Sequence, residues 1–461
     1  MNTRSMAGAM FHAALLGLVV LAATAARADT EFVVNTSADL IDDNTDDGVC
    51  HTSANTCSLR AAVMQANHLL VPEISNIRLP AGTYALTRPI NGADGEDNGD
   101  VNLTVPNAAG QFIAIYGNGA ASTIIDANQL DRAFSIDVGR VAGISGVTIL
   151  DGFSTGASGG AIFNRGTLVV ADCVISDNTS PVHGGGIYNE NLLHVFASTI
   201  TSNSAQRNGG GIYSSGTLLV GESTLSANHA HNFGEGGGGM YVSGPTMLRD
   251  STLFLNTANN GGGVLNLDQL TVVNSTVSYN RADTNGGGIY NFGGAFVYNT
   301  TVDGNDADFD NNGEGAGGGV YADAASGHRF VVVNMLVSSN TFHDGSIYND
   351  CDGTLEVYGM NLFSDMSGCS FSGNGPMATG VVSRNTIGGL EDNGGPTVTH
   401  ALLPGSEAID NTVDALGCVD DTGAPLATDQ RGAPRTAGVR CDVGSFEYGA
   451  IVDVIFTGSF E

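Results

Sequence analysis

Four carboxylate side chains lie close together in the longest variable loop of the chain: Asp306, Asp308, Asp310 and Glu314. A hard cation such as Ca²⁺ takes several oxygen ligands, and carboxylates at alternate positions can meet around it. The match to a calcium-binding loop is incomplete, because Asn311 replaces the turn glycine and Gly317 replaces the final glutamate. Two interpretations remain, a Ca²⁺ site and a solvated acidic loop, and Asp94–Asp100 is a weaker case of the same kind. No other cofactor is implied.

Aromatic residues recur at one position of a periodic pattern, interrupted by Leu265: Phe163, Tyr188, Tyr213, Tyr241, Tyr290, Tyr321 and Tyr348. An isoleucine or similar residue precedes most of them, and strand alternation turns the aromatic ring outward if that residue points inward. An exposed column of tyrosines can stack on sugar rings and bond their hydroxyls. The alternative is that the rings only cover the outer face of a sheet. We predict weak glycan binding here.

The loops that precede this column vary in length while the rest of the pattern keeps its period, as at 179–183, 204–208 and 229–236. Loops in one phase of a stacked repeat align along one edge, which is commonly a binding face. Arg207 and Arg281 are candidate cationic ligands at this edge. His229 and His231 are interpreted as exposed loop residues.

Acid–base chemistry on a polysaccharide would need a general base or a pair of carboxylates. The chain has no lysine, so a lyase would depend on Arg207 or Arg281. Asp420 and Asp421 adjoin, but neighbours in a strand point to opposite faces and make a poor pair for hydrolysis. These patterns favour a non-enzymatic protein. The alternative is a polysaccharide lyase or glycoside hydrolase acting in the groove of the fold.

A repeat of about 25 residues positions all of these side chains. Its first half is Gly-Gly-Gly-Ile-Tyr, as at Gly184–Tyr188, and its second half is Ser-Thr-Ile-x-x-Asn, ending at Asn178, Asn203, Asn228, Asn256, Asn280, Asn305 and Asn340. Short stretches alternate apolar and polar residues, which indicates strands of three to five residues. We predict an all-β fold, a right-handed parallel β-helix of the pectin-lyase-like solenoid type.

Two apolar columns should point inward, the one that contains Ile187 and Ile212 and the one that contains Ile175 and Ile200. The asparagine column is expected to mark a tight corner, because asparagine tolerates the left-handed conformation, and its stacked amides can bond from turn to turn. The glycine triplets are expected to supply a bend with positive φ.

Five segments are expected along the chain. Residues 1–28 have a positive start, an apolar run and Ala26-Arg27-Ala28, which is typical of a secretory signal peptide. Residues 29–75 form an N-terminal cap with a helix from Ser58 to Leu70, and residues 76–365 form the β-helix. Residues 366–450 form an irregular C-terminal cap, and residues 451–461 are a tail that is a possible sorting signal.

Charge and cysteine content limit the partners and the compartment. The net charge of −31 repels phosphate backbones, so nucleic-acid binding is excluded, and no later stretch is long enough to span a membrane. Seven cysteines in an exported chain indicate disulfides, with nearest-neighbour pairs Cys50 with Cys57, Cys351 with Cys369, and Cys418 with Cys441. Cys173 is left over and is expected to be a buried small residue.

Three parts of the sequence resemble known families. Cys57-Ser-Leu-Arg-Ala-Ala resembles the CSLREA domain of secreted bacterial proteins, with Ala61 in place of its glutamate. The glycine and asparagine repeats resemble those of chlamydial polymorphic outer-membrane proteins. Gly394–Asp410, Asp429–Arg435 and Cys441–Glu447 resemble the choice-of-anchor Q domain. The tail is similar to short C-terminal endings of some Gram-negative secreted proteins, with Ser459 as a departure. These families supply no established catalytic residues.

Together these features predict an exported protein, secreted or on the outer surface of a Gram-negative bacterium. Its expected role is adhesion to a polysaccharide or another cell-surface component along the aligned loop edge. A third interpretation is a purely structural, cation-buffered surface rod. The oligomeric state and the mode of surface attachment are left open.

Overall fold

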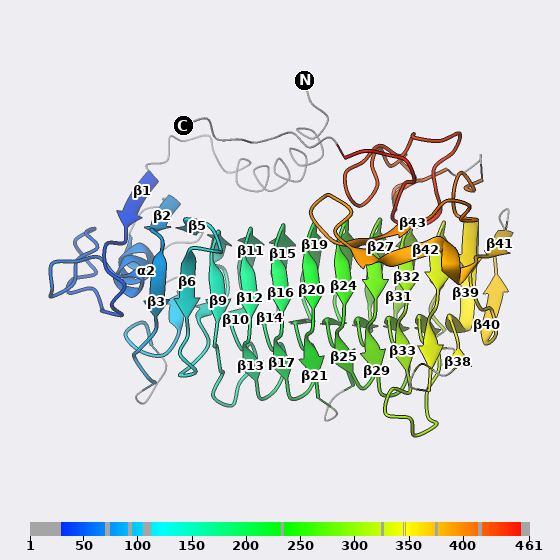
Figure 1. The fold of residues 1–461 in the computed structure, drawn as a ribbon. Helices are drawn as coiled ribbons and strands as arrows, with labels where there is room; N and C mark the ends of the chain where they lie inside the picture. Colours follow the sequence, from blue (N-terminus) through cyan, green and yellow to red (C-terminus); the bar gives the residue numbers. More distant parts are fainter. Residues whose placement is uncertain are drawn as a thin grey trace.

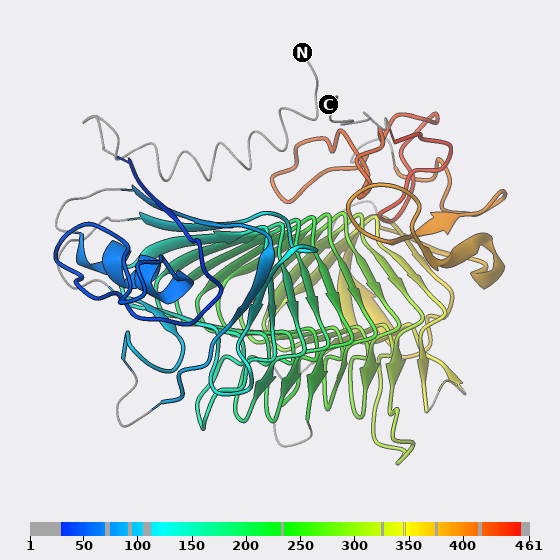
Figure 2. The same ribbon diagram turned by 60° about the vertical axis from the view of Figure 1, so that its left-hand side comes forward.

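The computed structural model of the 461-residue chain describes residues 29–69, 74–90, 95–104, 112–231, 235–323, 327–343, 345, 347–373, 377–413 and 417–452. The predicted signal peptide and most of the predicted tail lie outside the described residues. Short parallel strands wind into a long solenoid with a single described α-helix at one end and an irregular region over the other (Figures 1 and 2). The predicted parallel β-helix is confirmed.

The solenoid has four faces, each a ladder of strands from successive turns. Face A consists of β1 (Asp29–Val33), β2 (Ile74–Leu79), β5 (Phe112–Gly117), β8 (Val141–Ser145), β11 (Thr167–Ala171), β15 (Leu192–Phe196), β19 (Thr217–Gly221), β23 (Thr246–Arg249), β27 (Gln269–Val273), β31 (Gly294–Tyr298), β35 (Phe330–Val333) and β40 (Cys369–Ser372). Face B consists of β3 (Gly82–Ala85), β6 (Thr123–Asp126), β9 (Thr148–Leu150), β12 (Val174–Ser176), β16 (Thr199–Thr201), β20 (Thr224–Ser226), β24 (Thr252–Phe254), β28 (Thr276–Ser278), β32 (Thr301–Asp303), β36 (Leu336–Ser338) and β41 (Met377–Val381).

The other two faces are built from shorter strands. Face C consists of β4 (Val101–Leu103), β7 (Phe134–Ile136), β10 (Ile162–Asn164), β14 (Ile187–Asn189), β18 (Ile212–Ser214), β22 (Met240–Val242), β26 (Val264–Asn266), β30 (Ile289–Asn291) and β34 (Val320–Ala322). Face D consists of β13 (Thr179–Ser180), β17 (Ser204–Ala205), β21 (His229–Ala230), β25 (Thr257–Ala258), β29 (Arg281–Ala282), β33 (Asp306–Ala307), β37 (Thr341–Phe342) and the antiparallel β38 (Ile347–Tyr348). The long strand β39 (Cys351–Phe363) continues faces C, A and B in turn.

Register between turns places like residues on like residues, which is why the repeat can build one continuous core. On face C, Ile187 pairs with Ile212, and Ile212 pairs with Met240. On face B, Ile175 pairs with Ile200. The side chains of both predicted inward columns are fully buried: Ile187, Ile212, Met240, Val264, Ile289, Val320, Ile175, Ile200, Leu225, Leu253, Val277, Val302 and Val337. Burying each such side chain contributes about 1.5–3 kcal/mol.

The asparagine column lies inside the solenoid as a continuous hydrogen-bonded ladder. The Oδ1 atom of Asn203 accepts from both the backbone amide and the Nδ2 of Asn178, at 3.1 and 2.9 Å, and Asn228 does the same for Asn203 at 3.1 and 3.0 Å. The predicted bonds from turn to turn are thus present. The predicted left-handed conformation is wrong by one residue, because the residue before each asparagine adopts it, for example Ser202 with φ of 56°.

Asp350 ends this ladder where another asparagine would otherwise stand. It accepts from the Nδ2 of Asn340 at 2.9 Å, and from the amides of Ser364 and Asp365 at 2.7 Å each. Because every group that faces its carboxylate is a donor, a residue that only accepts fits this last position. Burial nevertheless raises the pKa of Asp350 to about 6.

This raised pKa predicts a pH dependence of stability. The folded-state pKa lies above the unfolded value of 3.8, so the contribution is fully present below pH 3.8 and is lost as the pH rises through 6. A shift of this size corresponds to about 3 kcal/mol. The advantage of the natural protein over Asp350→Asn in urea denaturation should therefore shrink between pH 4.5 and 7.5. An advantage that grows with pH over this range would contradict the prediction.

The glycine triplets allow neighbouring turns to approach where face D passes into face C. The first glycine of each triplet adopts positive φ, for example 70° at Gly209. The second glycine has no room for a side chain, because a Cβ atom on Gly210 would lie 2.5 Å from the carbonyl oxygen of Gly238. The prediction of a positive-φ bend is therefore confirmed for the first glycine only, and close approach of backbones explains the second.

The helix α2 (Leu59–His68) covers the N-terminal mouth of the solenoid (Figures 1 and 2). Its N-cap Ser58 accepts from the amide of Ala61, and the apolar residues on one side of the helix join the core of the β-helix. The predicted capping helix is present, two residues shorter at its C-terminal end than expected. Position 70 lies outside the described residues.

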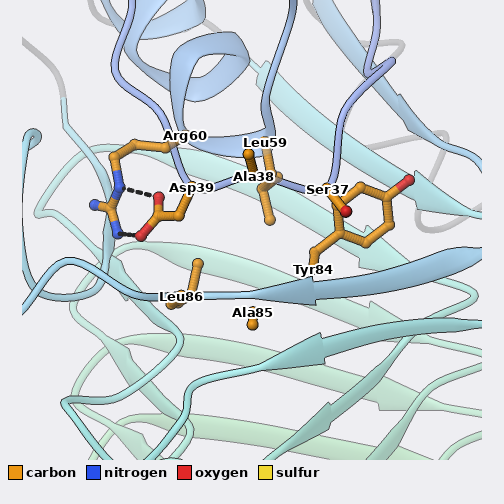
Figure 3. Close-up of a pocket in the computed structure, with 8 residues that line it drawn as sticks. All are labelled: Ser37, Ala38, Asp39, Leu59, Arg60, Tyr84, Ala85 and Leu86. Atoms are coloured by element: carbon orange, nitrogen blue, oxygen red, sulfur yellow. Dashed lines mark hydrogen bonds and ion pairs between the residues drawn. The ribbon is translucent and has the colours of Figure 1, made fainter.

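Arg60 of this helix is fully buried in the cap. Its guanidinium bonds both carboxylate oxygens of Asp39, at 2.7 and 3.3 Å, and the carbonyls of Gly99 and Asp100 at 2.8 Å each. Figure 3 shows this ion pair beside a cavity of about 10 Å³ lined in part by Leu59 and Tyr84. Such a volume holds no more than about one water molecule. The cavity is therefore too small for a ligand, and we interpret the cap as structural.

The C-terminal region is irregular, as predicted, but it packs along the flank of the solenoid. A hairpin of β42 (Ile387–Glu391) and β43 (Thr399–Leu402) lies over face B (Figure 1). Side chains of successive turns bond to this region: Thr252 to Val398, Thr276 to Gln430, Ser278 to His400, Asn274 to Arg435 and Thr301 to Ser445. The segments that resemble the choice-of-anchor Q domain supply several of these contacts.

All three expected disulfides are present: Cys50–Cys57, Cys351–Cys369 and Cys418–Cys441. Cys173 is buried and unpaired, as expected, and burial raises the pKa of its thiol to about 12. In the part of the chain that the structure describes, no helix has the length and apolar character needed to cross a membrane.

Candidate functional site

The tyrosines of face C form a stacked row on the outside of the solenoid. The ring centroids of Tyr188 and Tyr213 lie 4.9 Å apart with an interplanar angle of 8°, and Tyr213 and Tyr241 repeat this geometry. Phe163 extends the stack at 5.3 Å from Tyr188. Rings stack in this way because the turn-to-turn spacing of a parallel sheet is close to an aromatic stacking distance. We call the ring column of face C the aromatic row: Phe163, Tyr188, Tyr213, Tyr241, Tyr290 and Tyr321.

Stacking corrects the expected mode of sugar recognition. The ring faces of Tyr188 and Tyr213 are covered by their neighbours, so these rings present edges and hydroxyl groups to the outside. Tyr241 is 5% exposed, and the rings of Tyr188 and Tyr213 are half-buried. The row therefore both covers the sheet and offers a line of polar edges. Tyr348 leaves the column, because it lies in β38 of face D beneath the guanidinium of Arg384.

The row has a break at Leu265, which is buried between Tyr241 and Tyr290. Beyond it, Tyr290 and Tyr321 stack with centroids 5.2 Å apart. The break shows that the fold accepts leucine at this position of a turn. The aromatic row consequently has a longer segment before Leu265 and a shorter one after it.

Carboxylate groups accept hydrogen bonds from tyrosine hydroxyls of the aromatic row. Tyr241 donates to Glu235 at 2.5 Å, and Tyr290 donates to Asp323 at 2.7 Å. Burial, together with Glu190 and the neighbouring Tyr213, raises the pKa of Tyr188 to about 12. The hydroxyls therefore stay protonated at neutral pH and act as hydrogen-bond donors beside fixed acceptors.

His183 adds a titratable side chain to the same edge. Its ring lies 4.7 Å from that of Tyr213, and its Nδ1 accepts from the amide of Asn208 at 3.3 Å. Burial, with the charge of Arg207, lowers its pKa, so it is neutral at physiological pH. Sequence reasoning missed His183 and Glu235, although both stand in loops of the same phase just before a glycine triplet. That shared phase was the available signal.

The two predicted arginines do not lie together. Arg207 is exposed in the loop before face C, and its charge adds to the effect of burial in lowering the pKa of His183. Arg281 is on face D, where its guanidinium lies 4.4 Å from the ring centroid of Phe309. The structure thus assigns Arg207 to the edge of the aromatic row and Arg281 to the base of the acidic insertion. At the N-terminal end of the row, Arg132 and Arg165 each lie 5.4 Å from the ring centroid of Phe163.

The predicted calcium ligands are directed to separate partners. Asp306 accepts from the hydroxyl of Thr341 at 2.9 Å, and Asp308 bonds the ring of His343 at 2.8 Å. Asp310 and Glu314 are exposed. Burial of Asp308 opposes its ionisation, but the bonds from His343 and from the Gly313 amide together lower its pKa.

The structure therefore offers no calcium cage in this loop. Among the described residues, no three or more His, Cys, Asp or Glu side chains are grouped as metal ligands would be. The described part of Asp94–Asp100, from Gly95 onward, is likewise without such a group. Each of Asp306 and Asp308 instead ties the insertion to the following turn.

Asp420 and the two histidines considered in the sequence have structural partners. Asp420 accepts from the hydroxyl of Thr422 at 2.6 Å and lies 3.9 Å from Arg249, so it holds a turn on the flank. His229 and His231 are half-buried and hydrogen-bonded to each other at 3.1 Å. Their interpretation as exposed residues is wrong, because face D continues through this loop.

Comparison with known proteins supports the repeat. A family model described as the Chlamydia polymorphic membrane protein repeat matches residues 172–190 and 197–215. No curated protein matches the chain. The A-module of mannuronan C-5 epimerase AlgE6 from Azotobacter vinelandii is 13% identical, with 67% of this chain and 89% of that module covered and a TM-score of 0.28.

A second solved structure, the PL6 family alginate lyase AlyGC, is 11% identical and has a TM-score of 0.31. The match covers 78% of this chain but 54% of the lyase. At these identities and TM-scores, neither likeness is used to infer a property of this chain. This chain is thus a disulfide-containing β-helix protein with repeats of a kind found in a membrane-protein family.

Proposed function

We propose that this protein is an exported surface protein that binds a neutral carbohydrate chain along the aromatic row and does not cleave it. The observation that supports this most is the pair of half-buried tyrosine edges at Tyr188 and Tyr213, which stack on the buried Tyr241 that donates to Glu235. Phenol hydroxyls that donate and carboxylates that accept are the groups that hydrogen-bond sugar hydroxyls.

The direction of the row favours an extended polymer. Stacked rings repeat every 4.9 Å along the solenoid axis, and an extended polysaccharide repeats its pyranose units at a similar interval. Each sugar unit can then meet the ring edge of one turn, so many weak contacts add along the chain by multivalency. The stacking of sugar faces on tyrosine faces is not needed in this arrangement.

Charge limits the polymer to one without many acidic groups. The protein has a net charge of −31, and Glu190, Glu235 and Asp323 lie along the row. Like charges repel, most strongly at low ionic strength. A polyuronate is therefore disfavoured, which also weighs against the lyase alternative.

The binding proposal predicts that Tyr188→Leu combined with Tyr213→Leu weakens binding at least tenfold. Leu265 already occupies the same position in another turn, so the fold should persist, while two donor edges are lost. The measurement is affinity for the strongest neutral glycan found on an array. Tyr279→Leu is the matched control, because Tyr279 is 38% exposed and lies outside face C, between β28 of face B and β29 of face D.

Two outcomes would contradict the proposal. One is unchanged affinity of the double variant with circular dichroism like that of the natural protein, and the other is binding to no neutral glycan. Product analysis of every glycan that binds distinguishes the alternative. Release of reducing ends or unsaturated uronates would replace the binding role by a hydrolase or lyase role, with His183 and Glu235 as the first residues to substitute.

A further inference from the structure

Five charged side chains are buried together where the C-terminal region packs on the solenoid. Each is 5% exposed or less, and we call them the buried charge cluster: Asp429, Arg431, Arg435, Asp442 and Glu447. Arg435 ties the cluster to the solenoid, because its NH2 group donates to Oδ1 of Asn274 in the corner between β27 and β28. The cluster therefore lies at the interface between the C-terminal region and the β-helix.

The charges of this cluster do not balance. Arg431 is held by Asp429, whose Oδ2 accepts from the guanidinium Nε at 2.9 Å and from NH2 at 2.6 Å. Arg435 faces the other two carboxylates, with its NH1 group 3.8 Å from Oε2 of Glu447 and 3.3 Å from the carbonyl oxygen of Asp442. With every group ionised, three carboxylates share two guanidinium groups, and a buried charge without a partner is costly.

The solenoid adds a further carboxylate to this imbalance. Asp250, which follows β23, interacts with Arg435 and accepts from Nδ2 of Asn274. Its neighbour Arg249 is partly exposed and lies 3.3 Å from it. Arg435 is thus shared by carboxylates of both the solenoid and the C-terminal region.

Hydrogen bonding shows which carboxylate of the cluster takes a proton most readily. Asp429 accepts from the guanidinium of Arg431 and from several backbone amides, and Asp442 accepts from two backbone amides. Glu447 accepts only through Oε2, from the amide of Asp442 at 2.9 Å, and within the described part of the chain its buried Oε1 has no hydrogen-bond partner. Because hydrogen bonds from N–H groups favour the charged form of a carboxylate, Glu447 is the group best placed to be neutral.

We propose that a proton on Glu447 acts as a pH-sensitive latch, which holds the C-terminal region on face B in acid and loosens it when the proton is lost. The proton removes the uncompensated negative charge beside Arg435, so that the interface is electrically balanced. Burial, with the nearby carboxylates of Asp442 and Asp429, raises the pKa of Glu447 to about 7, which agrees with its hydrogen bonding.

The direction of the pH effect follows from the two states of the region. When the region detaches, Glu447 meets water and its pKa returns to 4.5. The contribution to docking is therefore fully present below pH 4.5, is lost as the pH rises through 7, and does not change further above that value. The interval from 4.5 to about 7 corresponds to a fall of about 300-fold in the docking equilibrium constant. Burial also raises the pKa of Asp442 and of Asp250, so their effects have the same sign.

Release of the region uncovers a column of hydroxyl groups on face B. Thr252, Thr276 and Thr301 pair in register and are at most 1% exposed beneath the C-terminal region. Thr199 and Thr224 hold the same position in earlier turns and are only half-buried. Figure 1 shows the region lying over the later turns and leaving the earlier ones open. The latch thus sets how much of this column is accessible.

The test is hydrogen exchange of the purified full chain between pH 4.5 and 8, resolved to single amides by mass spectrometry. The backbone amide of Ser445 reports on docking, because it donates to Oγ1 of Thr301 in the solenoid. After correction for the intrinsic pH dependence of exchange, we expect its protection factor to fall about 300-fold from pH 4.5 to 7 and then to level off. In Glu447→Gln, which cannot ionise, the fall should be at least tenfold smaller. Glu407→Gln removes an exposed carboxylate of the same region and should leave the fall unchanged.

Protection of Ser445 that does not change with pH in the natural protein would overturn the proposal, as would an equal fall in Glu447→Gln. The first of these outcomes needs no variant, so the proposal can fail even if Glu447→Gln does not fold. The amide of Asn203, inside the solenoid, should stay more protected than that of Ser445 at every pH, which shows that the opening is local. Because the cluster adjoins face B and the aromatic row lies on face C, this proposal and the glycan-binding proposal fail separately.

Discussion

Replacement of Asn228 by leucine is expected to lower the free energy of unfolding by about 4 kcal/mol, because it interrupts the asparagine ladder in mid-solenoid. Asn228 is fully buried, accepts from the amide and the Nδ2 of Asn203, and donates to Ile200 and Asn256 at 2.9 Å each. Leucine has a similar volume but none of these groups. The backbone amide of Asn203 would then be buried without an acceptor.

The measurement is urea denaturation followed by circular dichroism, since the chain contains no tryptophan. Asn228→Asp is a second variant that keeps an acceptor for Asn203 but loses the donor and faces the oxygens of Ile200 and Asn256. It should be at least as destabilising. Ser202→Ala, at the exposed corner of the preceding turn, should change stability by about 0.5 kcal/mol or less. A leucine variant as stable as this control would show that the ladder contributes little.

Replacement of Arg60 by methionine is expected to cost about 3–5 kcal/mol, because it leaves the carboxylate of Asp39 buried without its partner. Both side chains are at most 1% exposed. The carbonyls of Gly99 and Asp100 would also lose their donors. Arg60→Lys should recover only part of the loss, since a single ammonium cannot reproduce the planar fork.

The matched control is Arg78→Met. Arg78 pairs with Glu31 at 3.0 Å, but the two side chains are 57% and 49% exposed, and such surface pairs contribute about 1 kcal/mol or less. Thermal unfolding and hydrogen exchange at the first turns would separate the two cases. Equal effects of Arg60→Met and Arg78→Met would mean that the cap does not depend on the buried pair.

The sequence predicted the solenoid well because its period reports directly on packing. Apolar residues such as Ile187 and Ile212 recur at positions that must face inward, and Asn203 and Asn228 recur at positions that must stack. The left-handed corner was misplaced because Ser202, Ala227 and Leu255 share a conformation without sharing a side-chain type. A left-handed backbone conformation that residues of different types adopt cannot be recognised from the residue type at that position.

The sequence predicted only part of the candidate site, because periodicity gives the position of a residue in a turn but not the orientation of its side chain. The periodicity located the aromatic row, but it could not show that Tyr188 and Tyr213 cover each other's faces, which depends on side-chain rotamers. It also could not reveal how His229 and His231 lie, since that depends on the hydroxyls of Ser204 and Thr257 in neighbouring turns. Packing of the C-terminal region on face B lacks any period at all.

The ladder that ends at Asp350 also restricts how the length of this protein can change. Every side-chain bond between its members is donated toward the C-terminal end, and each asparagine occupies the same place in its turn. Removal or duplication of one whole coil preserves this polarity and every register, whereas removal of a few strand residues destroys both. Smaller changes are expected to be tolerated in the loops that already differ in length, such as those between faces D and C. The length of the solenoid is therefore expected to change only by whole turns.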